Sequence, residues 1–538
     1  MNDLSSDNRD VALTSESEVL NSSGDFPAEE ISLQQKVKIP FTADIKDSYF
    51  ALFAFILGFI FARLVLFTGQ GWGVSLFTLL YCSSVTVYLL KKGIHIPRAG
   101  WFWLAVVMVI GLSYALWSNN GLAPWQGLLL FGSAVYWILS ATGLLILGKT
   151  SNLLLLDAYR ALFAIPFGNF GCQYKSLALL VSNKRTRGKE LFSIFLGLFL
   201  TFIVMIIVFP LLMEADSGGF ARIVEGIAAC FTFGQGFWET FWQLILAVPI
   251  AAYIFGLVAG SAHKRGTDMS KEDTILTVSA FQILPMTTVY ILLGLLCTLY
   301  MVFIGSQVPY FFSAFVGQRP EGWQVYSEYA RSGFFELCGI AFINLIVLTA
   351  ANVMSQKQRS SSLALKILNA LLAVLTLVLI TTAFSKMALY IGAYGLSMRR
   401  LLPCVFMIFM AVICGGIIAL QKWQFSITRL AVGTGIIMFC ILCLFNPDSY
   451  VARYNADRYL SGTLKNFDVE ILYRSGPAGV APALMVYERT DDQALQADLE
   501  VYLLAQKKKA DKLAGKPGDS VERAQARDKV SESFAANK

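Results

Sequence analysis

The sequence has very few histidines, and it lacks the common nucleotide-binding motifs. His95 and His263 are its only histidines among 538 residues. A histidine-based catalytic triad, a histidine proton relay and a histidine-rich metal site are therefore unsupported. We also find no glycine-rich phosphate loop ending in Lys-Ser or Lys-Thr, and no dinucleotide fingerprint after a strand. From these absences we predict no metal, nucleotide or other cofactor.

Charged residues are also scarce, because apolar residues dominate the chain. Hydrophobic residues make up 56% and charged residues 15% of the sequence, and the mean hydropathy is +0.60. Such a composition is typical of a polytopic membrane protein. The net charge of +7 comes from Lys and Arg in short segments between apolar runs, which indicates membrane topology rather than nucleic-acid binding. We predict an all-α transmembrane bundle whose partner is the lipid bilayer, with no nucleic-acid partner.

About eleven apolar runs are long enough to cross a bilayer. They lie near 48–68, 71–90, 101–117, 124–147, 191–213, 238–260, 277–304, 334–354, 367–390, 401–420 and 426–446. Residues 1–45 are polar and predict a disordered tail, so the bundle occupies 46–446. Residues 447–538 predict a small helical segment followed by a polar tail. From Gln506 this segment has little to bury and predicts a solvated helix or a loose tail.

The loops between these runs differ in positive charge. One alternate set carries about eighteen Lys and Arg residues, and the other carries about five. Because positively charged loops stay on the cytoplasmic side, this bias predicts a bacterial inner-membrane protein with a cytoplasmic N-terminus. An odd number of spans then places the C-terminal segment outside the cytoplasm.

Two connecting segments alternate apolar and polar residues, near 151–182 and 219–232. This pattern predicts helices that lie on the membrane surface. The same pattern also fits helices that cover the bundle by packing on its spans.

Polar side chains gather near the extracytoplasmic ends of two spans. Lys386, Tyr390 and Tyr394 are spaced by four and share one helical face, and Tyr329 and Glu336 share another. These positions predict an outer polar cluster that binds a ligand. Its candidate members are Tyr329, Arg331, Glu336, Lys386, Tyr390, Tyr394 and Arg400. The alternative is that Lys386 snorkels to the headgroups and Glu336 stabilises a helix N-terminus.

Three sequence patterns resemble a bacterial multi-pass membrane family known as domain of unknown function 4173. The first is Tyr329-Ala-Arg-Ser-Gly-Phe-Phe-Glu-Leu337 followed by Asn344. The second is Tyr394-Gly-Leu-Ser397 with Arg400, where the family tends to have Thr in place of Ser. The third is Asn446-Pro-Asp448 with Ala452 and Asn455. The resemblance covers about 191–484 and implies fold and location. It implies no catalytic residues, and the acidic residue of the family's later motif falls on Gly479.

Three hypotheses of function follow. The first is a non-catalytic sensing or assembly component, with a possible membrane or periplasmic protein partner. The second is a transporter or lipid-handling protein with an outward-facing polar pocket. The third is an intramembrane enzyme using Glu336, Lys386 and the tyrosines as acid–base groups.

Overall fold

The computed structural model describes most of the chain. The described residues are 41–151, 153–181, 235–265, 285–315, 334–353, 363–423 and 425–536, with isolated positions between 197 and 212. Within these ranges the regular structure is helical throughout, as the sequence predicts. The predicted span at 191–213, the predicted surface helix at 219–232 and the first forty residues of the predicted tail lie outside this description.

Ten long helices form the bundle within the part of the chain that the structure describes. They are α1 (Ile45–Phe61), α2 (Trp72–Lys91), α3 (Arg98–Leu116), α4 (Ala123–Thr142), α10 (Gln235–Ala262), α12 (Met286–Phe315), α14 (Phe334–Val353), α15 (Leu363–Tyr394), α16 (Met398–Ala419) and α17 (Ile427–Phe445). Among the described residues, nine helices are long and apolar enough to cross a membrane, namely all of these except α4. α4 is as long as α2, but it is less apolar along its length, with Gln126, Ser133 and Ser140 among its residues. The prediction of an all-α polytopic bundle is confirmed.

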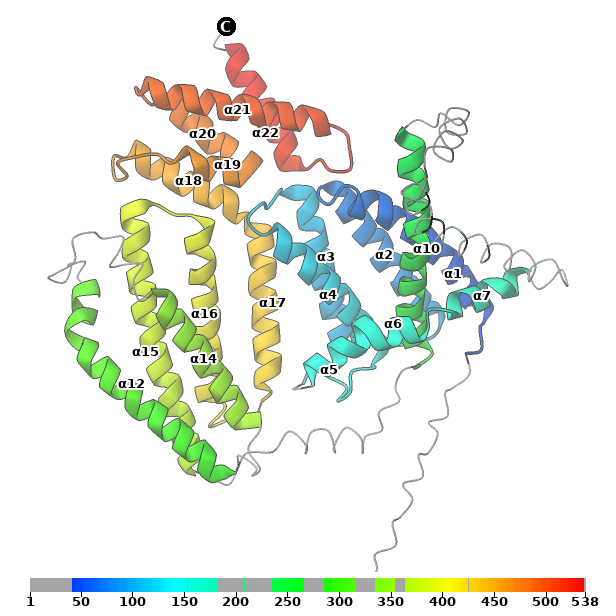
Figure 1. Cartoon of the computed structure of the whole chain (residues 1–538), viewed down its shortest axis with the longest axis horizontal. Helices are drawn as coiled ribbons and strands as arrows, with labels where there is room; N and C mark the ends of the chain where they lie inside the picture. The colour runs from blue at the N-terminus through cyan, green and yellow to red at the C-terminus, as the bar shows by residue number, and fades with distance from the viewer. Residues whose placement is uncertain are drawn as a thin grey trace, which may run out of the picture. The chain divides into compact units, whose positions relative to one another are not determined.

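The long helices pack around two apolar cores, which α17 joins (Figure 1). The first core takes its side chains from α1–α4 and α10, and the second from α12 and α14–α16. Along α17, Ile427 and Ala431 pack on the second core, whereas Ile436 and Phe439 pack on the first. This helix therefore holds the two groups of spans together.

Short helices follow α4 and lie against α4 and α10. They are α5 (Leu154–Tyr159), the π-helical turn η2 (Arg160–Ala164), α6 (Ile165–Gly168) and α7 (Cys172–Val181). A Cβ at Gly256 of α10 would collide with the Pro166 carbonyl, so glycine permits this close approach. The side chains of Leu155, Tyr159, Phe163 and Phe167 remain exposed. The segment packs on the bundle, and its place at the membrane surface stays a prediction.

The helices after α17 pack around a third apolar core, and we call this group of helices the C-terminal cap. It consists of α18 (Pro447–Leu460), α19 (Val469–Ser475), the 3-10 turn η4 (Gly476–Gly479), α20 (Val480–Tyr487), α21 (Gln493–Leu513) and α22 (Val521–Ala536). Leu499, Tyr502 and Leu503 are fully buried, and Val530 of α22 is buried with them. The segment after Gln506 therefore differs from the solvated or loose tail that its composition predicts.

Candidate functional site

The C-terminal cap sits across the ends of α15, α16 and α17 (Figure 1) and contacts three turns of the bundle. We call this end of the bundle the capped end. The first turn joins α1 to α2, where the N–H groups of Trp72 and Gly73 donate to the carbonyls of Asp519 and Pro517, each at 2.9 Å. Gly71 adopts φ +88° there, and a Cβ on it would collide with the Gly518 backbone. Backbone hydrogen bonds therefore join this turn to the cap.

The second turn joins α3 to α4 and meets two buried carboxylates of the cap. The Gly121 N–H donates to Asp448 Oδ2 at 2.9 Å, and the Ser118 N–H donates to Glu522 Oε2 at 3.0 Å. The Asn446 side-chain amide donates to the other oxygen of Glu522. Asp448 is 1% exposed and Glu522 is 7% exposed, so both carboxylates lie in the interface between bundle and cap.

Burial controls the ionisation of these two acids. It raises the pKa of Asp448 to about 6, with the nearby Glu522 charge adding to the effect and the Gly121 hydrogen bond opposing it. Burial also raises the pKa of Glu522, against the hydrogen bonds from Ser118 and Asn446. Both carboxyl groups therefore keep their protons to a higher pH in this interface than they would in water.

The third turn joins α15 to α16 and forms one side of a groove. Here Asn455 of α18 binds the backbone of Leu396, and Arg458 Nη1 donates to the Ile391 carbonyl at 3.1 Å. Beside this turn, α14, α15 and α16 face α19 across a hollow of about 380 Å³, which we call the cap groove. Its lining is Phe334, Phe335, Met387, Tyr390, Tyr394, Ser397, Arg399, Arg400, Asp468, Glu470, Ile471 and Arg474. A second hollow of about 490 Å³ shares Ser397, Arg399, Ile471 and Arg474 with it and extends to Asp448.

The structure brings three of the predicted site residues together in this groove. The Arg400 guanidinium lies 4.3 Å from the centre of the Tyr390 ring and donates to the Tyr394 carbonyl at 2.9 Å. The Tyr390 and Tyr394 rings meet edge to face at 5.4 Å. Arg400 thus satisfies the last carbonyls of α15 while it borders the groove.

The other predicted residues lie elsewhere. Glu336 is exposed in the first turn of α14, and Lys386 is half-buried on α15, close enough for their charges to interact. The first-turn position also suits the alternative, in which Glu336 stabilises the helix N-terminus. Tyr329 and Arg331 fall outside the described residues.

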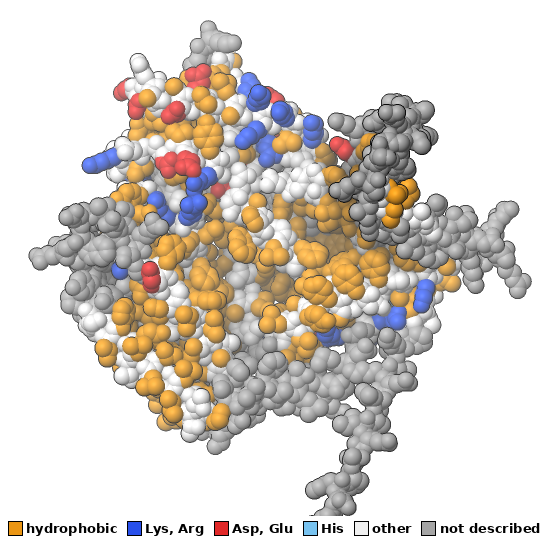
Figure 2. All heavy atoms as spheres, in the orientation of Figure 1, with side chains coloured by type: hydrophobic (Ala, Val, Ile, Leu, Met, Phe, Trp, Pro, Cys, Tyr) orange, Lys and Arg blue, Asp and Glu red, His pale blue; other side chains and the backbone are white. Residues whose placement is uncertain are grey.

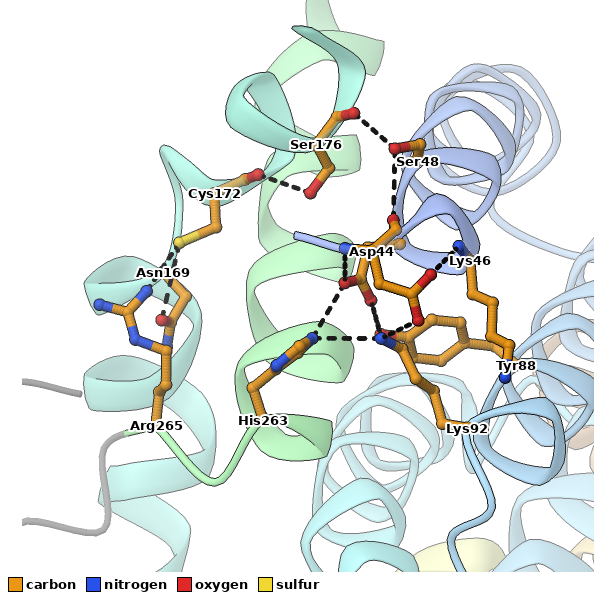
Figure 3. Close-up of polar contacts among 11 residues, drawn as sticks. Asp44, Lys46, Ser48, Tyr88, Lys92, Asn169, Cys172, Ser176, His263 and Arg265 are labelled. Carbon is orange, nitrogen blue, oxygen red and sulfur yellow. Dashed lines mark hydrogen bonds and ion pairs between the residues drawn. The ribbon is translucent and has the colours of Figure 1, made fainter. Parts of the chain in front are cut away.

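A buried ionic cluster at the opposite end of the bundle went unpredicted (Figure 3). Asp47 of α1 is fully buried, with Lys92 Nζ at 2.8 Å and His263 Nε2 at 3.0 Å. Lys92 and His263 point towards each other in Figure 3. The Tyr88 hydroxyl donates to Asp47 Oδ1 at 2.7 Å. Asp44, at the exposed edge, also contacts Lys92 at 3.3 Å. These contacts fasten the ends of α1, α2 and α10 to one another.

Sequence reasoning missed this cluster because Lys92 and His263 stand in short connecting segments, where a solvated position is the usual expectation. The available signal was Asp47, an acid at the head of an apolar run. Sequence reasoning also failed to place Arg399 and Arg474 in a shared groove, and it assigned Asp448 no role.

Comparison with known protein families finds a match to residues 104–485, described as a domain of unknown function (DUF4153). Neither the curated proteins nor the solved structures include a match. The expected kind of family, one of unknown function, is confirmed, but the matching family is not number 4173. Because the match covers well over half of the 538 residues, the chain belongs to the DUF4153 family.

Proposed function

We propose that this chain is a non-catalytic sensing component whose C-terminal cap responds to a ligand held in the cap groove. One observation carries the proposal: the groove takes one wall from the spans α14–α16 and the other from α19 of the cap. A ligand that touches both walls binds with a free energy that depends on the position of α19. Occupancy therefore shifts the equilibrium between positions of the cap.

A contact path leads from the groove to the other turns. Arg474 and Ser475 end α19 and are followed by Gly476, which adopts φ +62°. A Cβ at Gly476 would collide with the Asn120 side chain of the α3–α4 turn. Movement of α19 therefore presses on the turn that holds the buried carboxylates of the cap.

We further propose that the capped end faces away from the cytoplasm of a bacterium, at its inner membrane. Lys46, Lys91, Lys92, Arg98 and Lys264 lie at the opposite end, near the Asp47 cluster, and positive charge is typical of cytoplasmic loops. A membrane or periplasmic partner would then read the position of the cap.

A buried polar group in the second core favours sensing over transport. Asn344 is fully buried, accepts from the Tyr300 hydroxyl at 2.7 Å and donates to Thr376 Oγ1 at 3.0 Å. These direct hydrogen bonds join α12, α14 and α15. Such pairing supports a dry helix interface at this depth.

The test places a wedge in the groove in place of the unknown ligand. In a chain with the nine native cysteines replaced by alanine, Ser397→Cys is modified with a bulky biotin maleimide. Ser397 lines the groove, and its side chain makes no capping hydrogen bond, so the substitution itself costs little. The matched control is Arg453→Cys, an exposed site on α18 outside the groove lining.

Hydrogen exchange measured by mass spectrometry reports the result. We expect modification at position 397 to speed amide exchange several-fold in residues 117–122 and at the start of α22, while modification at position 453 leaves exchange unchanged. Complete modification at 397 with unchanged exchange would show a rigid cap and end the sensing proposal.

A further inference from the structure

Three arginines border the cap groove. Arg399 and Arg400 come from the first turn of α16, and Arg474 comes from the last turn of α19. The acids Asp468 and Glu470 also line it, and Glu470 binds Arg474 at 2.6 Å. Among the described residues that line the groove, three cations against two carboxylates leave a net positive charge. The planar guanidinium group suits phosphate oxygens, because it can donate two parallel hydrogen bonds.

The start of α16 adds to this positive field. α16 has 22 residues, and its N-cap, Ser397, leaves the first turn without a side-chain hydrogen bond. N–H groups at a helix N-terminus favour a nearby anion. Since Ser397, Arg399 and Arg400 all line the groove, the helix end and the guanidinium groups act on the same space.

The remaining wall of the groove is apolar and continues onto the side of the bundle. Phe334, Phe335, Met387 and Tyr390 form this wall, and Phe335 is 58% exposed. Along the same helix α14, the side chains of Phe342, Ile343 and Ile346 are also exposed. Figure 2 shows hydrophobic side chains over the sides of the long helices, with charged side chains gathered towards the C-terminal cap. A soluble phosphate would use the arginines but not this apolar surface, which on a membrane-crossing helix faces acyl chains.

From this combination we propose that the cap groove binds the phosphate headgroup of an anionic phospholipid, whose acyl chains lie along α14. The inference deepens the proposed function, because it names the class of ligand for the same groove. Tyr390 and Tyr394 sit where aromatic side chains commonly border headgroups.

The test measures lipid binding by the full chain in detergent. Native mass spectrometry follows titration with phosphatidylglycerol or phosphatidylcholine, and glycerol phosphate serves as the soluble competitor. We expect phosphatidylglycerol to bind at least tenfold more tightly than phosphatidylcholine, with no displacement by millimolar glycerol phosphate. In the double variant Arg399→Gln, Arg474→Gln we expect this preference to disappear.

A matched control uses an arginine of the same kind outside the groove. Arg453 and Asp457 form an ion pair four residues apart, like Glu470 and Arg474. Because Arg453 lies outside the groove lining, Arg453→Gln should leave the lipid preference unchanged. Should the double variant lose thermal stability, the single variant Arg399→Gln serves instead. The Arg399 side chain is exposed, so replacing it should leave the fold intact and reduce the lipid preference several-fold.

Three results would overturn the inference. Equal binding of the two lipids would exclude a phosphate headgroup site, and an unchanged preference in both groove variants would place the lipid elsewhere. Displacement by glycerol phosphate would identify a soluble phosphate ligand. If lipid selectivity fails while the wedge at position 397 still moves the cap, sensing stands with another ligand. If the wedge fails while selectivity holds, the groove is a lipid site on a rigid cap.

Discussion

Asn455 holds Leu396 through both ends of its side-chain amide. The Leu396 N–H donates to Asn455 Oδ1 at 2.7 Å, and Asn455 Nδ2 donates to the Leu396 carbonyl at 2.7 Å. Asn455 belongs to α18, and Leu396 belongs to the α15–α16 turn. Both residues are buried, so water does not replace these bonds. The pair fastens the C-terminal cap to the turn that borders the groove.

Asn455→Ala removes both bonds and leaves two buried backbone groups of Leu396 without partners. We expect a loss of about 2–4 kcal/mol in the free energy of unfolding, measured by titration with a denaturing detergent. Asn466→Ala, in an exposed loop of the same cap, should change it by less than about 0.5 kcal/mol. Equal effects of the two substitutions would mean that the amide pair contributes nothing specific.

The two buried acids predict a dependence of stability on pH. The pKa of Asp448 rises from 3.8 to about 6 in the folded chain, and burial raises the pKa of Glu522 as well. A raised pKa means that the folded state holds its proton more tightly, so the stabilisation is complete below about pH 4 and is lost as pH rises through 6. For Asp448 alone we expect a decrease of about 3 kcal/mol in the free energy of unfolding between pH 4 and pH 8.

Asp448→Asn supplies the control for this pH dependence. The Asn side-chain oxygen can still accept from the Gly121 N–H, but it does not titrate over this range. We expect the variant to show a flatter pH profile and to be more stable than the native chain at pH 8. Parallel pH profiles for the two proteins would assign the dependence to other groups.

Lys92 has two acidic partners that differ in burial. The Asp47 side chain is fully buried, whereas the Asp44 side chain is 44% exposed. Asp47→Asn leaves Lys92 and His263 without the buried charge that they share, and we expect a cost of about 3–5 kcal/mol. Asp44→Asn keeps an N-cap side chain on α1 and should cost less than about 1 kcal/mol. Unfolding titrations of both variants measure the two losses of stability. Equal losses would show that the buried Asp47 charge contributes no more to stability than the exposed Asp44.

Water access to position 344 distinguishes a dry bundle from a solvated one. Its side chain is fully buried and paired with Tyr300 and Thr376. In the cysteine-free chain we expect Asn344→Cys to resist a membrane-impermeant maleimide, while Ser397→Cys in the groove reacts within minutes. Reaction at position 344 would show water deep in the second core and would favour the transporter hypothesis.

Individual spans could be predicted because hydropathy over a helix length is a local property. The predicted runs 401–420 and 426–446 correspond to α16 (Met398–Ala419) and α17 (Ile427–Phe445). The spacing of Tyr390 and Tyr394 likewise predicts a shared face from neighbouring residues alone. Where one helix determines the answer, sequence pattern is sufficient.

Contacts between distant segments could not be predicted in this way. Arg474 shares a groove with Arg399, and His263 meets Asp47, only because several helices pack together. The region after Gln506 was misjudged for a related reason. Its small side chains add little to the hydrophobicity of the segment. Ala526 and Val530 are nevertheless buried in the core of the cap. Burial of small side chains depends on the surface they meet.

The contact between Trp72 and Asp519 also bears on how the protein is made. Residues 517–519 leave the ribosome after all the described spans. The α1–α2 turn therefore has no contact with them until the bundle has been synthesised. Helices can enter the bilayer during that time, but the groove lacks its second wall until α19 has emerged. Chains halted before α19 would thus insert their spans without forming the cap groove.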